Sequence, residues 1–465
     1  MRIHLIAIGG SAMHNLALAL YYNHHTVSGS DDEIYNPARE RLESAGLLPV
    51  DEGWFPDKIT KDIDIIILGM HARPDNPELE KALKLGIQVM SYPEFIFEHS
   101  KDKKRVVIAG SHGKTSTTSM ILHVLKSIDS SKYEKDLRFD YLVGAQLEGF
   151  QRMVQLSDAP IMVIEGDEYL SSPIDKRPKF LHYKPHIAVI TGIAWDHINV
   201  FPTFEEYTLQ FELFLESIAE KGIVFYFKND NILKEQVKQT QGIDTIPYEG
   251  FDAKVLEGQT FLITDRQQDI PLHIFGQHNL ENLQAAYLVC RELGITDEDF
   301  FQSIQRFEGA ARRLQLLREE KEFKAFLDFA HAPSKVKATI EALKHQYQDR
   351  GLVACVELHT FSSLSKPFLK EYKGAMNKAD IAIVFFSEHT LKMKKLQKIL
   401  PSDIQVAFDH PNLKVFTENE KMLAFLKEID WDRKNLVMMT SGNFNGLDLK
   451  ADVQGLEVGG IDSRT

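Results

Sequence analysis

Residues 104–118 read KRVVIAGSHGKTSTT, in which a strand signal, a glycine loop and a helix signal follow one another directly. The run Arg105–Ala109 is apolar after its first residue and has three β-branched residues in a row, which predicts a buried strand, and a helical pattern starts at Thr115. Gly110 and Gly113 stand between the two elements. Glycines let backbone N–H groups close around phosphate oxygens, and the helix N-terminus adds positive potential. The stretch therefore predicts a phosphate-binding loop.

Two side chains at the end of this loop carry the chemistry that such loops need. We expect the Lys114 ammonium to reach the β- and γ-phosphates of a nucleotide and the Thr115 hydroxyl to ligate Mg²⁺. The loop is a short G-x-x-G-K-T form, because Ile108 stands where the longer Walker pattern has glycine. An ordinary strand–turn–helix connection is the alternative to a phosphate site. The residues predicted to bind the nucleotide here are Gly110, Ser111, His112, Gly113, Lys114, Thr115 and Ser116.

Strand and helix signals alternate along the rest of the chain as they do around the loop. Most strand signals are continuous apolar runs, which is typical of strands covered on both faces. The predicted strands are Ile3–Ile8, Ile63–Leu68, Arg105–Ala109, Ile161–Ile164, Ile187–Thr191, Ile223–Phe227, Leu352–Val356, Ile381–Phe386 and Leu436–Thr440. The predicted helices include Glu78–Lys84, Thr115–Lys126, Phe204–Ala219, Asn282–Leu293 and Ser334–His345. This alternation predicts an α/β fold with mainly parallel sheets.

The length of 465 residues predicts three domains, because a domain has about 150 residues. One boundary is expected at the charged stretch 99–104, and a second near residues 307–313. The predicted domains are therefore 1–101, 102–308 and 309–465.

The composition is that of an ordinary globular protein, with 43% hydrophobic and 26% charged residues. Asp and Glu exceed Lys and Arg by 67 to 54, and this excess makes the chain a poor general partner for nucleic acid or anionic membranes. No apolar run approaches the roughly 18 residues of a membrane span, and we expect no signal peptide. The two cysteines, Cys290 and Cys355, predict no disulfide framework and favour a cytoplasmic location.

Acidic, histidine and asparagine residues follow further along the chain. Glu165 ends a predicted strand, at the carboxyl edge where α/β folds contact ligands, and its carboxylate is a candidate Mg²⁺ ligand. His197 follows the next predicted strand, although a lone histidine is more often structural than a ligand. Asn279 and Asn282 either cap the helix that follows or hydrogen-bond a purine.

Taken together, these motifs resemble the Mur ligase family of peptidoglycan synthesis. The matching segments occur in the family's order across nearly the whole chain: IAIGGSAMHNLA (6–17), VSGSDD (27–32), GSHGKTSTT (110–118), EGDEY (165–169), AWDH (194–197), GQHNLENLQAA (276–286), GAARRLQ (309–315), DFAHAPSKV (328–336) and LVMMTSGNFNG (436–446). The resemblance implies an ATP- and Mg²⁺-dependent ligase that forms an amide bond through an acyl phosphate. It implies an N-terminal Rossmann-like domain for a UDP-sugar, a central P-loop ATPase domain, and a C-terminal Rossmann-like domain for the acceptor.

The resemblance also implies roles for individual residues. Lys114, Glu165 and His197 would be catalytic, and Thr115 would hold Mg²⁺ together with Glu165 and His197. Further implied contacts with ATP are Asn279, Asn282, Arg313, Asp328 and His331. The implied UDP-sugar contacts are Gly9, Gly10, Ser11, Ala12, Met13, Ser30, Asp31 and Asn76, and the implied acceptor contacts are His359, Thr360 and Ser363. Two glycines of the family's N-terminal pattern are Ala7 and Ala12 here, so we expect part of the close backbone approach to be lost.

Two subgroups of the family use UDP-N-acetylmuramate, and they differ in the acceptor. One adds L-alanine, and the other adds the tripeptide L-Ala-γ-D-Glu-meso-diaminopimelate. The segment GDEYLSSPIDKRPKFLHYKP (166–185) resembles the tripeptide subgroup. At Thr360 and Ser363 the two arginines of the alanine subgroup are absent, which also favours the tripeptide. L-Alanine stays the alternative acceptor, and the chain is expected to be a monomer or a homodimer.

Three other classes explain less of the sequence. Folylpolyglutamate synthase shares the central domain but lacks a UDP-sugar domain. A non-catalytic sugar-nucleotide sensor would be expected to lose Lys114, Thr115 or Glu165, and all three are present. An NAD-dependent oxidoreductase does not explain the loop at Gly110.

Overall fold

The computed structural model describes residues 1–147, 149–150, 152–195, 200–264 and 269–458. Contacts divide the chain into two compact units. The first unit consists of Met1–Ile193, Tyr207–Glu249 and Ala285–Phe300, and the second of Ala194–Glu206, Gly250–Gln284 and Phe301–Thr465. Helices α6 (Phe204–Glu216), α8 (Gln277–Leu293) and α9 (Asp297–Ile304) contribute residues to both units.

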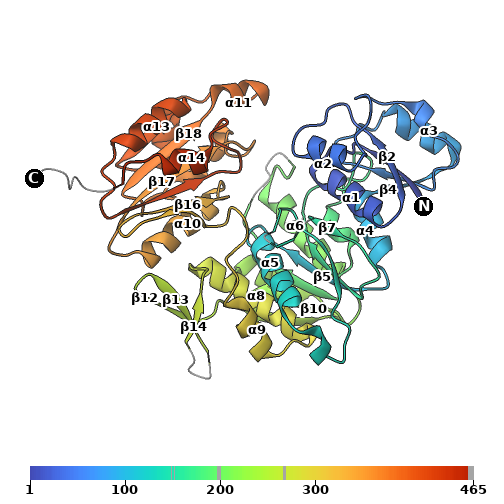
Figure 1. Ribbon diagram of the computed structural model, residues 1–465, viewed down its shortest axis with the longest axis horizontal. Coiled ribbons are helices and arrows are strands. Elements are labelled where there is room, and N and C mark those ends of the chain that lie inside the picture. Colours follow the sequence, from blue (N-terminus) through green and yellow to red (C-terminus); the bar gives the residue numbers. More distant parts are fainter. Residues whose placement is uncertain (148, 151, 196–199, 265–268, 459–465) are drawn as a thin grey trace, which may run out of the picture. The chain divides into compact units, whose positions relative to one another are not determined.

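The first unit begins with a parallel sheet of four strands in the order β2-β1-β3-β4, drawn in blue in Figure 1. Its strands are β1 (Arg2–Ile6), β2 (Thr26–Ser30), β3 (Ile65–Leu68) and β4 (Gln88–Ser91). Its helices are α1 (Ser11–Tyr22), α2 (Ala38–Ser44), η1 (Pro56–Lys58), α3 (Pro77–Leu85) and α4 (Tyr92–Ser100). Ile6, Ile66 and Leu79 are buried in one cluster, so α3 packs its apolar side on the sheet.

A second sheet in this unit has seven strands in the order β11-β10-β9-β5-β8-β6-β7, parallel except for the β6–β7 pair. Its strands are β5 (Lys104–Ala109), β6 (Phe139–Leu142), β7 (Val154–Gln155), β8 (Ile161–Glu165), β9 (Ile187–Ile190), β10 (Ile223–Phe227) and β11 (Asp244–Tyr248). The shorter elements and helices are α5 (Lys114–Ser127), η2 (Ser130–Lys132), η3 (Lys179–His182) and α7 (Asn231–Gln239). Because β5, β8 and β9 are parallel neighbours, their carboxyl ends meet at one edge.

The second unit contains an antiparallel sheet of three strands and a sheet of six strands in the order β15-β16-β20-β17-β18-β19. In the larger sheet only the β15–β16 pair is antiparallel. The strands are β12 (Ala253–Leu256), β13 (Gln259–Ile263), β14 (Asp269–Leu272), β15 (Gln315–Glu319), β16 (Lys324–Asp328), β17 (Gly351–Leu358), β18 (Ile381–Phe386), β19 (Leu413–Phe416) and β20 (Lys434–Met439). The helices are α10 (Pro333–Gln346), η4 (Lys366–Tyr372), α11 (Glu388–Met393), α12 (Pro401–Phe408), α13 (Asn419–Glu428) and α14 (Leu449–Gln454).

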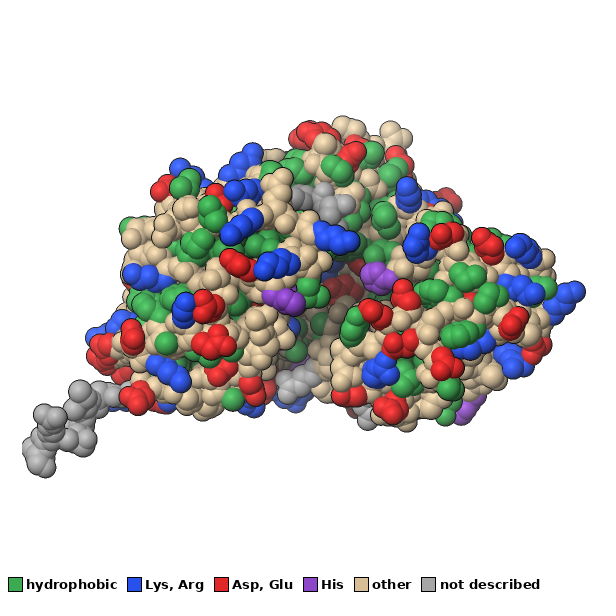
Figure 2. All heavy atoms as spheres, turned by 90° about the horizontal axis from the view of Figure 1, so that it is seen from above, with side chains coloured by type: hydrophobic (Ala, Val, Ile, Leu, Met, Phe, Trp, Pro, Cys, Tyr) green, Lys and Arg blue, Asp and Glu red, His purple; other side chains and the backbone are tan. Residues whose placement is uncertain are grey.

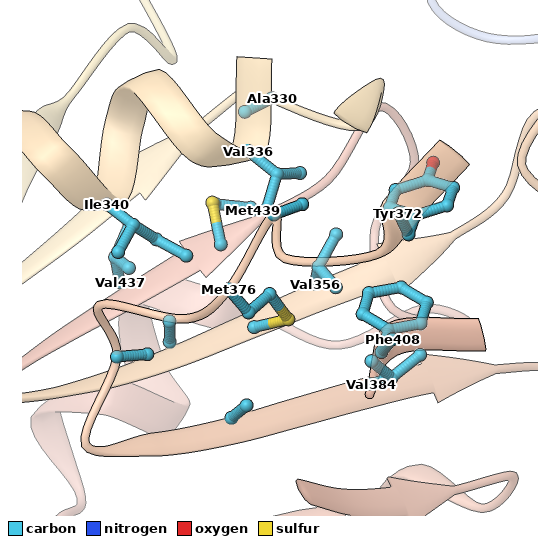
Figure 3. Packing of buried hydrophobic residues seen from close by; sticks show 14 of the residues in the cluster. Ala330, Val336, Ile340, Val356, Tyr372, Met376, Val384, Phe408, Val437 and Met439 are labelled. Carbon is cyan, nitrogen blue, oxygen red and sulfur yellow. The ribbon is translucent and has the colours of Figure 1, made fainter. Parts of the chain in front are cut away.

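The larger sheet of the second unit is covered on both faces. Val356 of β17 lies in the cluster with Val336 and Ile340 of α10 and Phe408 of α12, as Figure 3 shows. Cys355, the next residue along β17, points to the opposite face and lies in a separate cluster. Because alternate side chains enter different cores, every position along this strand is apolar or buried.

The expected fold class is confirmed: the sheets are mainly parallel, and the predicted strands all correspond to observed strands to within a few residues. Most strands without a sequence prediction are edge strands or belong to the antiparallel sheet, but β6 and β16 are inner strands that each pair with a neighbour on both sides. Four of the five residues of β11 are exposed, so this strand has no continuous apolar run. The domain limits 1–101, 102–308 and 309–465 stay a prediction.

The visible surface carries charges of both signs. On the face shown in Figure 2, acidic and basic side chains are interspersed with apolar ones. Among the described residues, no helix combines the length and the apolar character that a membrane span requires.

Candidate active site

The glycine loop lies at the carboxyl end of β5, and its backbone has room only for glycine. Gly110 has φ +120° and Gly113 has φ +76°, both in the region that favours glycine. A Cβ atom on Gly110 would lie 2.2 Å from Thr191 Oγ1 and 2.8 Å from Thr191 N. Thr191 also holds the loop directly, because its hydroxyl donates to the His112 carbonyl and, at 3.2 Å, to the Ala109 carbonyl.

Lys114 is the first residue of α5, and its ammonium turns back over the loop. The Lys114 Nζ donates to the Gly110 carbonyl at 2.7 Å and to Glu168 Oε2 at 2.6 Å. Burial lowers the pKa of Lys114, but the Glu168 carboxylate, together with the charges of Asp167 and Glu165, raises it, and the net shift is upward. The loop therefore holds a permanently charged cation, as phosphate binding requires.

Thr115 and Glu165 meet beside this cation. The Thr115 hydroxyl donates to Glu165 Oε1 at 2.7 Å, and Glu165 Oε2 accepts from the Gly144 N–H at 2.8 Å. A hydroxyl and a carboxylate at hydrogen-bond distance supply the oxygen ligands that Mg²⁺ prefers, so these residues fit the ion. The third predicted ligand, His197, lies outside the described residues.

Two residues that contact the loop were not singled out from the sequence. Glu168 pairs with Lys114, and the Tyr207 hydroxyl lies 2.8 Å from Ser111 Oγ and 3.2 Å from Glu168 Oε1. Glu168 was within reach of sequence reasoning, because it belongs to the acidic segment that begins with Glu165. Tyr207 offered no such signal, because it stands among the apolar and aromatic residues of α6 and resembles a core residue.

A second cluster of potential metal ligands in the described part of the chain contains an arginine that pairs with its carboxylates. Glu94, Asp175 and His182 place one ligand atom each within 4.8 Å of the others. The Arg177 guanidinium lies 2.7 Å from Asp175 Oδ2 and 3.8 Å from Glu94 Oε1. Because a cation already compensates both carboxylates, this arrangement is an ion-pair network rather than a vacant metal site.

In the second unit, His278 lies near Arg313 and Asp328, whose charges shift its pKa in opposite directions. Burial lowers the pKa of His278, the Asp328 carboxylate opposes this, and the Arg313 guanidinium adds to it. The Arg313 guanidinium lies 4.9 Å from the ring centroid of Phe329. The predicted ATP contacts Arg313 and Asp328 thus lie near one another.

Two of the predicted ATP contacts have structural hydrogen bonds. Asp328 accepts from the N–H groups of Leu314 and Ala330, at 2.7 and 2.8 Å, and so fixes the turn after β16. The Asn279 amide donates to the Phe275 carbonyl at 2.9 Å, ahead of α8. Asn282 and His331 are buried. Contact of these residues with ATP stays a prediction.

The residues predicted for the UDP-sugar surround the end of β1. The Gly9 N–H donates to Asp31 Oδ2 at 2.7 Å, and a Cβ on Gly9 would lie 2.9 Å from the same oxygen. Burial raises the pKa of Asp31 to about 6 against the opposing effect of the Gly9 N–H. Ser30 is buried, and its carbonyl accepts from the N–H groups of Ala7 and Ile8.

The remaining predicted UDP-sugar contacts include a helix cap. Asn76 accepts from the N–H groups of Glu78 and Leu79 and thereby caps α3. Gly10 occupies the N-cap position of α1, whose first residues are Ser11, Ala12 and Met13.

Ala7 has a backbone conformation that favours glycine. Its φ is +67°, a left-handed conformation that costs an L-residue roughly 1–2 kcal/mol. Glycine would relieve this strain. The variant would lose about 0.8 kcal/mol of stability because a methyl group is no longer buried. It would lose roughly 0.4–1 kcal/mol more because glycine makes the unfolded chain more flexible. These effects largely cancel, so we expect Ala7→Gly to change the free energy of unfolding by less than about 1 kcal/mol.

The matched control is Ala17→Gly in the middle of α1, where the φ is helical. There glycine gains nothing, so we expect a loss of about 1.5–2 kcal/mol from helix propensity and the buried methyl group. Urea denaturation of both variants checks the contrast. Equal losses would show that Ala7 is not strained.

The predicted acceptor residues follow β17. His359 Nδ1 lies 3.6 Å from the buried Glu357 Oε1. Thr360 and Ser363 bond to one another: the Thr360 N–H donates to Ser363 Oγ at 2.9 Å, and the Ser363 N–H donates to Thr360 Oγ1 at 3.1 Å. Both hydroxyls thus close a tight turn and carry no charge.

The strand, glycine loop and helix, with Lys114 and Thr115 at the end of the loop, have the arrangement with which α/β enzymes bind nucleotide phosphates. Three family models match in order: "Mur ligase family, catalytic domain" over residues 2–104, "Mur ligase middle domain" over 108–290, and "Mur ligase, glutamate ligase domain" over 312–443. The chain belongs to the Mur ligase family, whose members are ATP-dependent ligases that form amide bonds. The expected family and enzyme class are thereby confirmed.

Named relatives of two kinds match the chain. UDP-N-acetylmuramate–L-alanine ligase of Lactobacillus gasseri is 30% identical over 82% of this chain and 84% of its own. UDP-N-acetylmuramate–L-alanyl-γ-D-glutamyl-meso-2,6-diaminoheptandioate ligase of Haemophilus influenzae is 24% identical over 96% of this chain and 98% of its own. The crystal structure of a murein peptide ligase from Psychrobacter arcticus shares the fold with a TM-score of 0.64, at 22% identity, over 98% of this chain and all of that one.

Proposed function

We propose that this enzyme joins UDP-N-acetylmuramate to the amine of L-Ala-γ-D-Glu-meso-diaminopimelate, with conversion of ATP to ADP and phosphate. The observation that carries the proposal is the turn of Thr360 and Ser363, in which neither side chain offers a positive charge. Free L-alanine has a carboxylate next to the reacting amine, and an arginine fork is the natural partner for it. In the tripeptide that carboxyl is already an amide, so an arginine there would be left unpaired and costly.

The terminal carboxylates of a longer acceptor would need a cation farther along this surface. Lys394 supplies one, because its Nζ lies 4.3 Å from the ring centroid of Phe361, between Thr360 and Ser363 in the chain. This placement supports a peptide acceptor whose charges lie away from its reacting amine.

The proposed reaction has two steps. The lactyl carboxylate of the sugar attacks the γ-phosphorus of ATP, the bond to the bridging oxygen breaks, and an acyl phosphate and ADP form. The acceptor amine then attacks the acyl carbon, phosphate leaves, and the amine nitrogen loses a proton. Phosphoryl transfer depends mainly on positioning and charge neutralisation, which gives Lys114 the central role.

We propose that Thr115, Glu165 and His197 hold Mg²⁺ in this reaction. The ion would supply charge neutralisation at the phosphate oxygens. The hydrogen bond of 2.7 Å between Thr115 and Glu165 supports the first two residues as a pair of ligands. A cytoplasmic location and the oligomeric state stay predictions.

Phosphate release with UDP-N-acetylmuramate and ATP tests the acceptor. We expect kcat/KM for the tripeptide to exceed that for L-alanine by at least ~10²-fold, the scale on which a site discriminates when a needed polar partner is missing. A reaction without UDP-N-acetylmuramate serves as the blank. Equal or faster turnover with L-alanine would overturn the proposal and favour the second candidate, the L-alanine ligase, which relatives of that name also support.

A further inference from the structure

A chain of buried polar side chains connects the phosphate loop to α6. It runs from Ser111 in the loop through the Tyr207 hydroxyl to the carboxylate of Glu168, and from there to Lys114. The four residues come from three separate parts of the sequence, since Tyr207 is 96 residues from Ser111 and 39 from Glu168. Tyr207 is fully buried and Glu168 is 1% exposed, so bulk water does not compete for these bonds.

The charge of Glu168 determines which groups donate and which accept in this series of hydrogen bonds. Glu168 pairs with an ammonium, so it is a carboxylate and can only accept hydrogen bonds. The Tyr207 hydroxyl must therefore donate its single hydrogen to Glu168 Oε1, and its oxygen then accepts from the Ser111 hydroxyl. Glu168 is thus held through one oxygen while its other oxygen holds Lys114.

We propose that Tyr207 is a positioning residue for the ligase reaction, which acts through Glu168 on the orientation of the Lys114 ammonium. The proposal rests on the role that the proposed function gives to Lys114. Without the tyrosine bond the Glu168 carboxylate would keep its charge but lose one of the contacts that fix its orientation toward Lys114. The Lys114 ammonium would keep its bond to the Gly110 carbonyl but would be held less firmly on the Glu168 side, and preorganisation of such charges is what electrostatic catalysis requires.

The hydroxyl can be removed without disturbing the core. The Tyr207 ring packs edge-on against Phe211, with ring centroids 5.4 Å apart, and phenylalanine keeps that contact. We expect Tyr207→Phe to lower kcat for ADP formation about 10-fold, with KM for ATP changed less than ~3-fold. That split indicates an effect on the reacting geometry rather than on folding or nucleotide affinity.

A double-mutant cycle tests whether Tyr207 acts through Glu168. Glu168→Gln alone removes the charge that orients Lys114, so the double variant with Tyr207→Phe should be no slower than Glu168→Gln. Additive losses would overturn the proposal, and so would unchanged kcat in Tyr207→Phe. The matched control is Tyr92→Phe, since the Tyr92 hydroxyl is buried without a hydrogen-bond partner in the described part of the chain and should not affect kcat.

The failure of this inference can be distinguished from failure of the proposed function. Turnover is followed with whichever acceptor the wild-type enzyme uses, so a wrong acceptor leaves the comparison intact. Lys114→Ala is measured in parallel. An active Lys114→Ala enzyme would refute the role of the lysine, whereas an inactive one beside a fully active Tyr207→Phe enzyme would refute only the inference.

Discussion

Lys114→Ala is expected to lower kcat for ADP formation by about 10²–10³-fold. This is the usual cost of removing one preorganised group that stabilises charge in the transition state. The lysine is held by the Gly110 carbonyl and by Glu168, at 2.7 and 2.6 Å, so no solvent cation can take its place with the same geometry. The measurement is coupled detection of ADP in the presence of UDP-N-acetylmuramate and acceptor. Circular dichroism spectra of the variant should match those of the wild type.

Lys126→Ala is the matched control for this variant. Lys126 lies on the same helix, α5, but is exposed and contacts the Gly149 carbonyl rather than the loop. We expect its kcat to stay within about twofold of wild type. Near-normal ADP formation by Lys114→Ala would contradict the assignment of the phosphate loop.

Arg105→Met is expected to cost about 3–5 kcal/mol in the free energy of unfolding, because it removes the guanidinium bonds to several carbonyl groups, among them that of the buried Tyr183. The Arg105 Nε donates to the Tyr183 carbonyl at 2.8 Å, and its Nη1 donates to the carbonyls of Ser100 and Lys101, both at 2.7 Å. The side chain thereby ties the start of β5 to the end of α4. Burial lowers the pKa of Arg105, yet the guanidinium keeps its charge at neutral pH.

Arg138→Met is the control for the stability measurement. The Arg138 side chain is 58% exposed and pairs with Asp136 and Asp158, which are also partly exposed. Such surface pairs contribute about 0–1 kcal/mol, so we expect little change. Urea unfolding followed by circular dichroism compares the two variants. A loss under about 1 kcal/mol in Arg105→Met would show that water replaces the guanidinium at these carbonyls.

The sequence by itself determined the elements whose signals are local. Ile381–Phe386 is a strand with the predicted limits, because a continuous apolar run is buried on both faces wherever it lies. The glycines of the loop were equally readable, because φ values of +120° and +76° are conformations that glycine alone adopts easily. Lys114 and Thr115 follow directly in the chain, so their place at the helix start needed no tertiary information.

Only the tertiary structure decided which side chains meet. Tyr207 contacts Ser111 across 96 residues, because the loop and the part of α6 that begins at Tyr207 belong to the same unit. Thr115 contacts Glu165 because β5 and β8 are neighbours in the sheet. The sequence of a strand does not by itself indicate which strand will lie beside it. Ala7 shows the same limit, since its left-handed backbone contradicts the preference of alanine. The backbone preference of alanine is worth about 1–2 kcal/mol and is outweighed by the packing of a whole sheet. That packing depends on residues far away in the chain.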